Sequence, residues 1–186
     1  MKKNICIFGG SRSGKNKKIE NSSKIIGQII AEMGFNLIFG GGETGIMGAV
    51  SSSVIKNGAK TTGIIPGFLL KNDLLDTTHS SEFNSKLITT ENMHQRKKIM
   101  YKKSNAFLVL PGGVGTLDEC FEVLTWCQLK QITNKQVGII NFEGYWDPLL
   151  KLINHLIEEE FMGNHNLNFF QEIKNTNNLK KFLKNI

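Results

Sequence analysis

Six short runs rich in Ile, Val, Leu and Phe recur along this chain, and stretches with helical periodicity separate them. The runs cover residues 4–8, 36–39, 61–65, 86–90, 106–110 and 136–141. The helical stretches cover residues 19–33, 46–57, 92–103, 116–130 and 148–160, with a terminal piece near 178–183. Because strands that alternate with helices form parallel sheets, the pattern predicts an α/β fold with a doubly wound parallel sheet flanked by helices.

The length of the chain, 186 residues of which 40% are hydrophobic, is that of one ordinary domain with its own core. We therefore expect a single domain over residues 1–186. No apolar run approaches the ~20 residues that cross a bilayer, and the N-terminus does not resemble a signal peptide, so we expect a cytoplasmic protein without membrane partners. Cys6, Cys120 and Cys127 lie in apolar segments without metal-ligand spacing, which predicts free, buried thiols.

The formal net charge of +7 is unevenly distributed. Seven of the first 24 residues are Lys or Arg, and Glu20 is the one acidic residue among them. A local basic patch fits one anionic ligand at least as well as a duplex, which is contacted along a face or stripe, so we expect no nucleic-acid partner. Of the 23 basic residues only Arg12 and Arg96 are arginines, whose planar fork lysine cannot reproduce.

Glycine-rich turns follow the first, second and fifth predicted strands. They read GGSRSG from Gly9, GGGETGIMG from Gly40 and PGGVGT from Pro111. The carboxyl ends of parallel strands share one edge of a sheet, so we expect these turns to converge on a single crevice. Glycine lets the backbone approach a ligand closely, and the helix that follows presents free N–H groups to an anion. The turns together predict a nucleotide or phosphate ligand.

The first glycine turn matches one common nucleotide-binding motif only in part and does not match a second. The first turn has the GxxxxGK spacing of a P-loop from Gly9 to Lys15, but Asn16 replaces the Ser or Thr that holds magnesium. No predicted strand ends in the aspartate expected for a second metal contact. The first turn lacks the GxGxxG spacing, and no acidic residue ends the second strand. Hydrolysis of nucleoside triphosphates and hydride transfer are therefore not predicted.

A carboxylate lies one helical turn beyond the third glycine turn. Glu119 follows Thr116 by three residues and Gly115 by four, so in a helix it shares a face with both. A phosphate held by the turn would therefore bring its ribose close to this carboxylate. Arg96 and Lys97 open the helix between the fourth and fifth strands, near the same edge, although such a segment can also be an ordinary basic surface turn.

The segments GGGETGIMG, MHQRK and PGGVGTLDE resemble the hallmarks of the Lonely Guy family, the cytokinin-activating phosphoribohydrolases formerly described as lysine decarboxylases. Similarity continues through residues 122–129 and 144–150 and extends nearly from Cys6 to Phe161. The resemblance implies a Rossmann-like homodimer that hydrolyses AMP or N6-prenylated AMP to free base and ribose 5-phosphate, with no cofactor and no metal. Trp126 and Leu129, which extend the apolar surface of their helix, support the homodimer.

Carried over position by position, the resemblance implies catalytic roles for Arg96 and Glu119. It also implies contacts with the nucleoside 5′-monophosphate from Lys97, Gly112, Gly113, Val114, Gly115, Thr116 and Thr125. From the other turns and the helix start we expect contacts from Gly10, Ser11, Arg12, Gly41, Gly42, Met47 and Met93. Asp73 falls on an acidic substrate contact that is usually Glu, within the irregular stretch 67–85 that we expect to form a lid or substrate wall. Base preference is left open by this difference.

The expected reaction is consistent with these residue types. Breaking an N-glycosidic bond builds positive charge at C1′, which a carboxylate can stabilise while it steers or deprotonates the attacking water. Arg96 can hold phosphate or aid departure of the base, and the sequence does not decide between these roles. The alternative function is a non-catalytic nucleotide or cofactor carrier of the same fold. Lysine decarboxylation is disfavoured because nothing marks a lysine for pyridoxal phosphate with an acidic partner.

Overall fold

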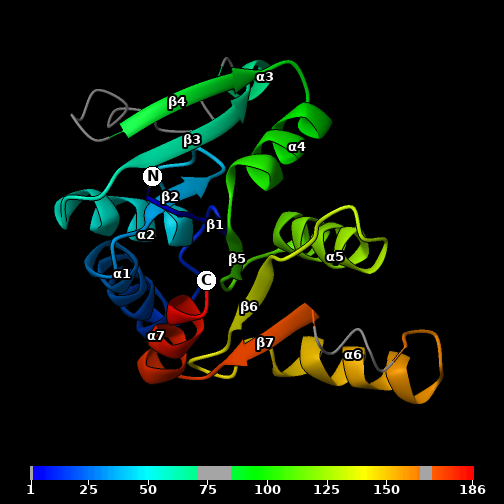
Figure 1. Ribbon diagram of the computed structural model, residues 1–186. Helices are drawn as coiled ribbons and strands as arrows, with labels where there is room; N and C mark the ends of the chain where they lie inside the picture. The colour runs from blue at the N-terminus through cyan, green and yellow to red at the C-terminus, as the bar shows by residue number, and fades with distance from the viewer. Residues whose placement is uncertain (1, 71–84, 164–168) are drawn as a thin grey trace.

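A seven-stranded parallel sheet runs through the computed structural model, which describes residues 2–70, 85–163 and 169–186 (Figure 1). The strand order is β4-β3-β2-β1-β5-β6-β7. The strands are β1 (Asn4–Phe8), β2 (Asn36–Phe39), β3 (Thr61–Pro66), β4 (Ser85–Thr90), β5 (Ala106–Val109), β6 (Gln136–Ile140) and β7 (Phe170–Ile173). The prediction of a doubly wound parallel sheet is confirmed.

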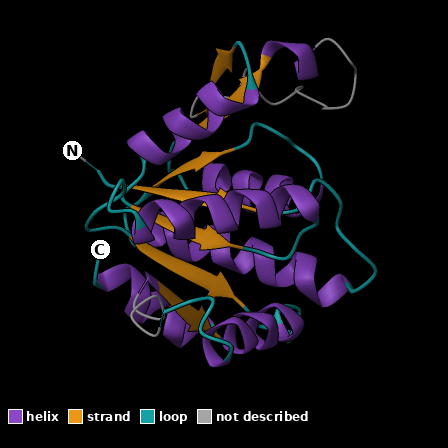
Figure 2. Ribbon diagram, turned by 90° about the vertical axis from the view of Figure 1, so that its right-hand side faces the viewer, coloured by secondary structure: helices purple, strands orange, loops and turns teal. Residues whose placement is uncertain are grey.

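The order of the strands reverses on either side of β1. This strand pairs with β2 through Ile5↔Leu37 and with β5 through Ile5↔Ala106, and the two halves of the sheet grow outward from it. The strands point the same way, and both termini lie at the edge where they begin (Figure 2). In open α/β sheets ligands bind beyond the carboxyl ends of the strands where the order reverses, which here is the gap between β1 and β5.

Helices cover both faces of the sheet. They are α1 (Lys17–Glu32), α2 (Gly45–Lys56), α3 (Gly67–Leu70), α4 (Met93–Lys103), α5 (Val114–Gln128), α6 (Asp147–Glu158) and α7 (Thr176–Lys184). Figure 1 shows α1, α2 and α7 on one side and α4, α5 and α6 on the other. Side chains of β1 alternate accordingly, because Ile5 and Ile7 pack toward α1 and α2 whereas Cys6 and Phe8 pack toward α4 and α5.

Helix α1 begins slightly earlier than its apolar periodicity indicates. Asn16, which takes the place of a P-loop Ser or Thr, is the N-cap, and its side chain accepts a hydrogen bond of 3.0 Å from the Lys18 N–H. The cap satisfies one of the free donors of the first turn, so the helix starts at Lys17. The Asn16 side chain therefore has a structural role as the cap of α1.

Two elements were not expected. β7 lies in a stretch whose sequence indicates no element, because FQEI carries only two apolar residues and the strand pairs on one side alone, with β6 through Val137↔Phe170. α3 is a four-residue helix at the start of the stretch expected to be irregular. Residues 71–84 of the expected lid, which include Asp73, lie outside the described residues, and Ser85 begins β4.

The cysteines match their prediction. Cys6, Cys120 and Cys127 are free and buried. Burial raises the pKa of Cys120 to about 12 and also raises the pKa of Cys6, so both thiols remain protonated at neutral pH. In residues 2–70, 85–163 and 169–186, no helix is long and apolar enough to span a bilayer. The same ranges contain no group of three or more His, Cys, Asp or Glu side chains arranged to hold a metal.

Candidate functional site

A cavity of about 580 Å³ opens where β1 and β5 end. Its size is typical of sites for small ligands and cofactors. The first and third glycine turns supply much of its wall, and the starts of α1, α2, α4 and α5 and the loop after β6 contribute the rest. The residues that line it are Gly9, Gly10, Ser11, Arg12, Ser13, Gly14, Ile19, Ile46, Met47, Met93, Arg96, Pro111, Gly112, Gly113, Val114, Gly115, Thr116, Asp118, Glu119 and Tyr145.

The first and third glycine turns pack backbone against backbone. The Gly10 N–H donates a hydrogen bond of 3.0 Å to the Pro111 carbonyl. A Cβ on Gly10 would lie 3.3 Å from the Gly112 Cα, and a Cβ on Gly112 would overlap the Thr116 hydroxyl and lie 2.8 Å from the Gly10 nitrogen. A side chain at Gly112 therefore has no room, and one at Gly10 would be tight against the backbone of both turns. The closeness of the two turns fixes one end of the cavity.

The N-terminus of α5 faces this end of the cavity. Gly113 is the N-cap and has no side chain to accept from the first amides of the helix. Those amides have no intrahelical acceptors, and they lie at the positive end of the helix dipole. Val114 and Gly115 are exposed, so an anion can reach them. This arrangement fits a phosphate group.

The second glycine turn lies mostly behind the cavity wall. Met47 lines the cavity, whereas Gly41 and Gly42 are buried and do not. Gly45 has a φ of +62°, and a Cβ there would overlap the backbone of Ser11. The Thr44 hydroxyl also donates to the Ser11 carbonyl, at 3.0 Å. The second turn thus supports the first from behind.

Arg96 and Glu119 form a buried ion pair at the floor of the cavity. The distance from Arg96 Nη1 to Glu119 Oε1 is 3.2 Å, and each side chain is about 10% exposed. The Arg96 Nε also donates to the Ile64 carbonyl, at 3.0 Å. Burial raises the pKa of Glu119 to about 7, against the opposing effect of the Arg96 charge. A carboxyl group with this pKa can exchange a proton near neutral pH.

Lys97 turns away from the cavity into a cluster of charged side chains on α4 and α5. Its ammonium lies 3.0 Å from Asp118 Oδ2 and 2.8 Å from Glu122 Oε2, and the Tyr101 hydroxyl donates to Glu122 Oε2 as well, at 2.5 Å. Burial lowers the pKa of Lys97, but hydrogen bonds and attraction to the two carboxylates outweigh this effect and raise it. Lys97 is therefore a charged lysine that holds Asp118, which does line the cavity.

Thr125 is not brought to the cavity of this chain. Its hydroxyl donates to the Phe121 carbonyl at 2.7 Å, and its side chain lies on the exposed side of α5. It follows Glu119 by six residues, which is ~9 Å along a helix. The position of Thr125 is open to contact with another molecule.

Tyr145 lines the cavity, and the sequence analysis did not single it out for the site. Its hydroxyl donates to the Gly112 carbonyl at 2.7 Å, which fixes the third glycine turn from outside. Asn141, at the end of β6, holds the loop that carries Tyr145 by donating to Asp147 at 2.7 Å and accepting from the Trp146 N–H at 2.8 Å. The position of Tyr145 near the site could have been predicted from the sequence, because β6 is parallel to β5 and must end at the same edge of the sheet.

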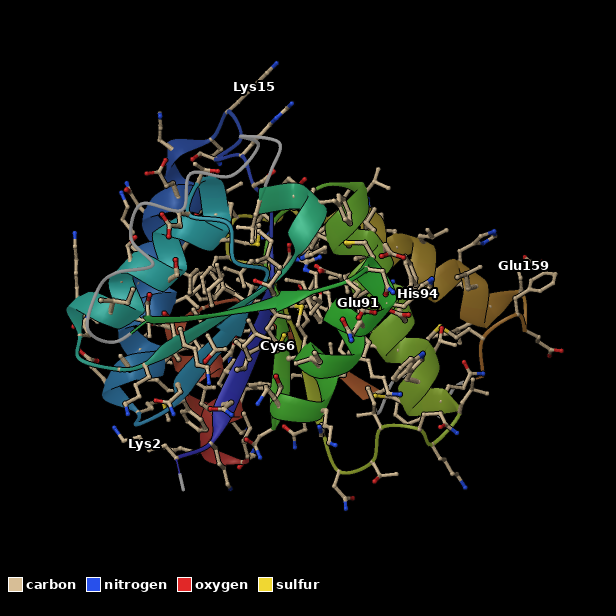
Figure 3. The ribbon with its side chains drawn as sticks, turned by 90° about the horizontal axis from the view of Figure 1, so that it is seen from above. Lys2, Cys6, Lys15, Glu91, His94 and Glu159 are labelled. Atoms are coloured by element: carbon tan, nitrogen blue, oxygen red, sulfur yellow. The ribbon has the colours of Figure 1, made fainter. Side chains whose placement is uncertain are left out.

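The basic residues of the first turn are not gathered into the cavity. Arg12 lines its rim and is exposed. Lys15 points away from the body of the protein (Figure 3). Lys17 and Lys18 are also exposed at the start of α1. No lysine is among the residues that line the cavity in the described ranges.

Comparison with known proteins finds relatives by sequence whose names give the same activity. The profile of the family described as "possible lysine decarboxylase" matches residues 47–183. A cytokinin riboside 5′-monophosphate phosphoribohydrolase of Arabidopsis thaliana is 40% identical over 86% of this chain and 71% of its own length. A relative from Oryza sativa subsp. japonica, named a probable enzyme of the same activity, is 39% identical over 86% of this chain. The chain spans 62% of the length of that rice relative.

Solved structures share the fold at lower identity. The molybdenum cofactor binding protein of Rippkaea orientalis matches with a TM-score of 0.69 and 22% identity, over 99% of this chain and 96% of its own. The molybdenum cofactor carrier protein of Chlamydomonas reinhardtii matches with a TM-score of 0.70 and 18% identity, over 99% of this chain and 97% of its own. At such identities the similarity extends to the fold alone.

Proposed function

Since the chain belongs to the Lonely Guy family, whose profile is described as "possible lysine decarboxylase", we propose that it hydrolyses a purine nucleoside 5′-monophosphate to free base and ribose 5-phosphate. The observation that carries the proposal is the buried pair of Arg96 and Glu119 beside a helix N-terminus that suits phosphate. AMP and N6-prenylated AMP are the proposed substrates. The cytoplasm is the proposed location.

The geometry supports separate roles for the glycine turns, which bind the phosphate, and for Glu119, which takes part in the reaction. The amides at the start of α5 and the Gly10 turn hold the 5′-phosphate, which orients the ribose toward Glu119. As the bond to the base breaks, positive charge grows at C1′, and the Glu119 carboxylate stabilises it and accepts a proton from the attacking water, whose hydroxyl bonds to C1′. The base leaves with the electron pair of the broken bond and takes up a proton from solvent, and Glu119 returns its proton to solvent. Arg96 favours the ionised form of Glu119 and orients its carboxylate, because its Nη1 contacts Glu119 while its Nε is fixed by the Ile64 carbonyl.

Decarboxylation of lysine, which the family description suggests, does not fit this site. Pyridoxal phosphate chemistry needs a lysine amine that can form a Schiff base, and such lysines have lowered pKa values. Lys97 is buried beside the cavity, yet its pKa is raised by hydrogen bonds to Glu122 and Asp118, which overcome the opposing effect of burial. The pKa of Lys135 is lowered by burial, but its ammonium donates to the Tyr101 carbonyl and does not line the cavity.

A non-catalytic carrier is the second candidate function, because solved structures that share the fold include proteins named for binding or carrying a cofactor. Two of them are named as a molybdenum cofactor binding protein and a molybdenum cofactor carrier. A carrier has no need for a carboxylate buried against an arginine at the floor of its cavity, because a buried charge is costly unless it serves a purpose. The ion pair therefore supports the enzyme over the carrier.

We expect AMP to be cleaved much faster than adenosine, because the 5′-phosphate occupies the amides at the start of α5 and a bare nucleoside leaves them empty. Purified protein is incubated with each compound, and adenine and ribose 5-phosphate are quantified by chromatography. A panel of other nucleoside monophosphates in the same assay defines base preference. Equal rates for AMP and adenosine would contradict the phosphate site, and tight binding of AMP without cleavage would favour the carrier.

The pH dependence of kcat/KM for AMP is expected to show an acidic limb near pH 7. The pKa of Glu119 is raised by burial to about 7, so below this pH the free enzyme carries the neutral acid and loses the reactive carboxylate. Activity therefore falls as pH drops below 7, approaching tenfold per unit, and levels off above it. The residual kcat/KM of Glu119→Gln is expected to lack this fall below pH 7. It then depends on pH only through the substrate phosphate, whose pKa is about 6. A rate that rises as pH falls would contradict the carboxylate role.

We also propose a homodimer that uses the exposed face of α5. Val114 and Leu129 are 84% and 63% exposed, and Phe121 lies between them on the same helix. Light scattering is expected to give twice the chain mass of 20.8 kDa, and Leu129→Glu to shift the protein toward monomer by adding a charge to this face. A single 20.8 kDa species at working concentration would contradict the dimer.

A further inference from the structure

Gly40, the first residue of the second glycine turn, is crowded by the guanidinium of Arg96. A Cβ built on Gly40 would overlap Arg96 Nη2 and lie 3.3 Å from its Cζ. The next neighbour is the Met47 Sδ, at 3.4 Å. Gly40 is buried and does not line the cavity, so it does not contact a ligand there.

The backbone conformation of Gly40 does not require glycine. Gly14, Gly34, Gly41, Gly45, Gly58 and Gly144 have positive φ among the described glycines, and Gly40 is not one of them. An alanine there is therefore free of backbone strain. The lack of a side chain at Gly40 is explained by the space that Arg96 occupies.

Arg96 reaches Glu119 by passing the carboxyl ends of two strands. Its Nε is fixed by the Ile64 carbonyl on β3, its Nη2 fills the space above Gly40 at the end of β2, and its Nη1 meets Glu119 on α5. Displacing Nη2 must turn the whole guanidinium, because the group is planar and rigid. A methyl group at position 40 therefore moves Nη1 away from the carboxylate.

We propose that Gly40 is a positioning residue whose missing side chain makes the slot through which Arg96 holds Glu119. The second glycine turn thereby serves the catalytic arginine, although its sequence has the character of a phosphate-binding turn. The kinetic consequences of the slot rest on the proposed hydrolase function. The placement of the guanidinium does not depend on it.

The ionisation of Glu119 reports on the slot directly. The charged and titratable groups that surround this carboxyl are Arg96, Lys97 and Tyr101 on α4, Asp118 and Glu122 on α5, and Cys6 on β1. Burial raises the pKa of Glu119, Arg96 opposes this effect, and the neighbouring carboxylates add to it. When Arg96 turns away, the pKa of Glu119 must rise further, because burial and its acidic neighbours remain.

The test compares Gly40→Ala, Arg96→Ala and the double variant in the full chain. The pKa of Glu119 is measured by ¹³C-carboxyl NMR, with its resonance assigned through Glu119→Gln. We expect Gly40→Ala to raise this pKa and to lower kcat for AMP by ~100-fold, with KM changed far less. In the Arg96→Ala background the same methyl group is expected to change neither quantity, because the slot is then empty. Non-additivity of this kind identifies an effect transmitted through Arg96.

Gly138→Ala is the matched control for crowding alone. A Cβ there would lie 2.5 Å from Ile173 Cδ1 and 2.8 Å from Leu108 Cδ2, in the core of the sheet and outside the residues that line the cavity. This variant is expected to lower Tm and to leave the pKa of Glu119 and kcat unchanged. The control separates loss of stability from loss of the arginine contact.

The proposal is overturned if Gly40→Ala leaves the pKa of Glu119 unchanged, or if its effect is as large in the Arg96→Ala background. If Gly40→Ala fails to fold, the double variant decides: recovery of the fold supports the slot, and continued failure overturns it. If the wild-type protein does not cleave AMP, the hydrolase proposal fails, and the NMR titration still tests the slot by itself.

Discussion

Glu119→Gln is expected to bind AMP about as well as the wild type and to cleave it at least ~100-fold more slowly. Glutamine keeps the size and much of the hydrogen-bonding capacity of the side chain but removes the negative charge. The proposed phosphate contacts come from residues 112–116 and the Gly10 turn, which line the cavity and which the substitution does not touch. Isothermal titration calorimetry measures binding, and chromatography of released adenine measures turnover. The expected pattern is retained affinity with lost chemistry.

Two controls support this comparison. Glu159→Gln makes the same substitution at an exposed residue at the end of α6, so it must leave both binding and turnover unchanged. Thermal unfolding verifies that Glu119→Gln is folded, because the buried Arg96 loses its charged partner. Turnover near the wild-type rate would show that the carboxylate is not required. A folded variant that cannot bind AMP would assign Glu119 to binding.

Arg96→Lys is expected to lower kcat for AMP by ~100-fold although the positive charge is kept. The arginine contacts the Ile64 carbonyl through Nε and Glu119 through Nη1 at the same time, with 3.0 and 3.2 Å separations. A lysine ammonium is a single point at the end of a flexible stem and cannot reproduce this fork. The measurement is a steady-state rate over a range of AMP concentrations, which separates kcat from KM.

Arg12→Lys is the matched comparison, since Arg12 is the other arginine of the chain. It is exposed at the rim of the cavity, where a lysine can still attract phosphate, so a small rise in KM and little change in kcat are expected. If Arg96→Lys retains kcat within about threefold of the wild type, the planar fork is not needed, and charge alone explains the conservation of function in that variant.

The strands and long helices were predictable because the pattern of apolar residues along each of them follows which side chains are buried. Along β1 and β5 the apolar residues are continuous, as expected for strands covered on both faces. β7 carries no comparable signal, because an edge strand half covered by helices needs few apolar residues. Pairing with β6, which is remote in sequence, determines its conformation, and periodicity within the strand does not reveal such a contact.

The candidate site was predictable where motif and topology agree. The edge shared by parallel strands predicts that Gly10, Gly112 and Glu119 lie together, and all line one cavity. The roles of individual glycines were not predictable, because a glycine that approaches a ligand and one that makes room for an arginine look alike in a sequence. Gly40 illustrates the difference, since its neighbour Arg96 comes from a helix more than fifty residues later.

The contact between Gly10 and Gly112 also has a consequence for the expected thermodynamics of phosphate binding. These turns touch through main-chain atoms, and the Tyr145 hydroxyl braces one of them from outside. Main-chain atoms held in this way have no rotamers to lose, so the amides that meet phosphate are preorganised when the protein folds. Binding then involves little ordering of the protein, and its entropic penalty falls mainly on the ligand. Ribose 5-phosphate carries the same phosphate, so under the proposed reaction we expect the rigid cradle to hold this fragment by the same contacts after the base has been released.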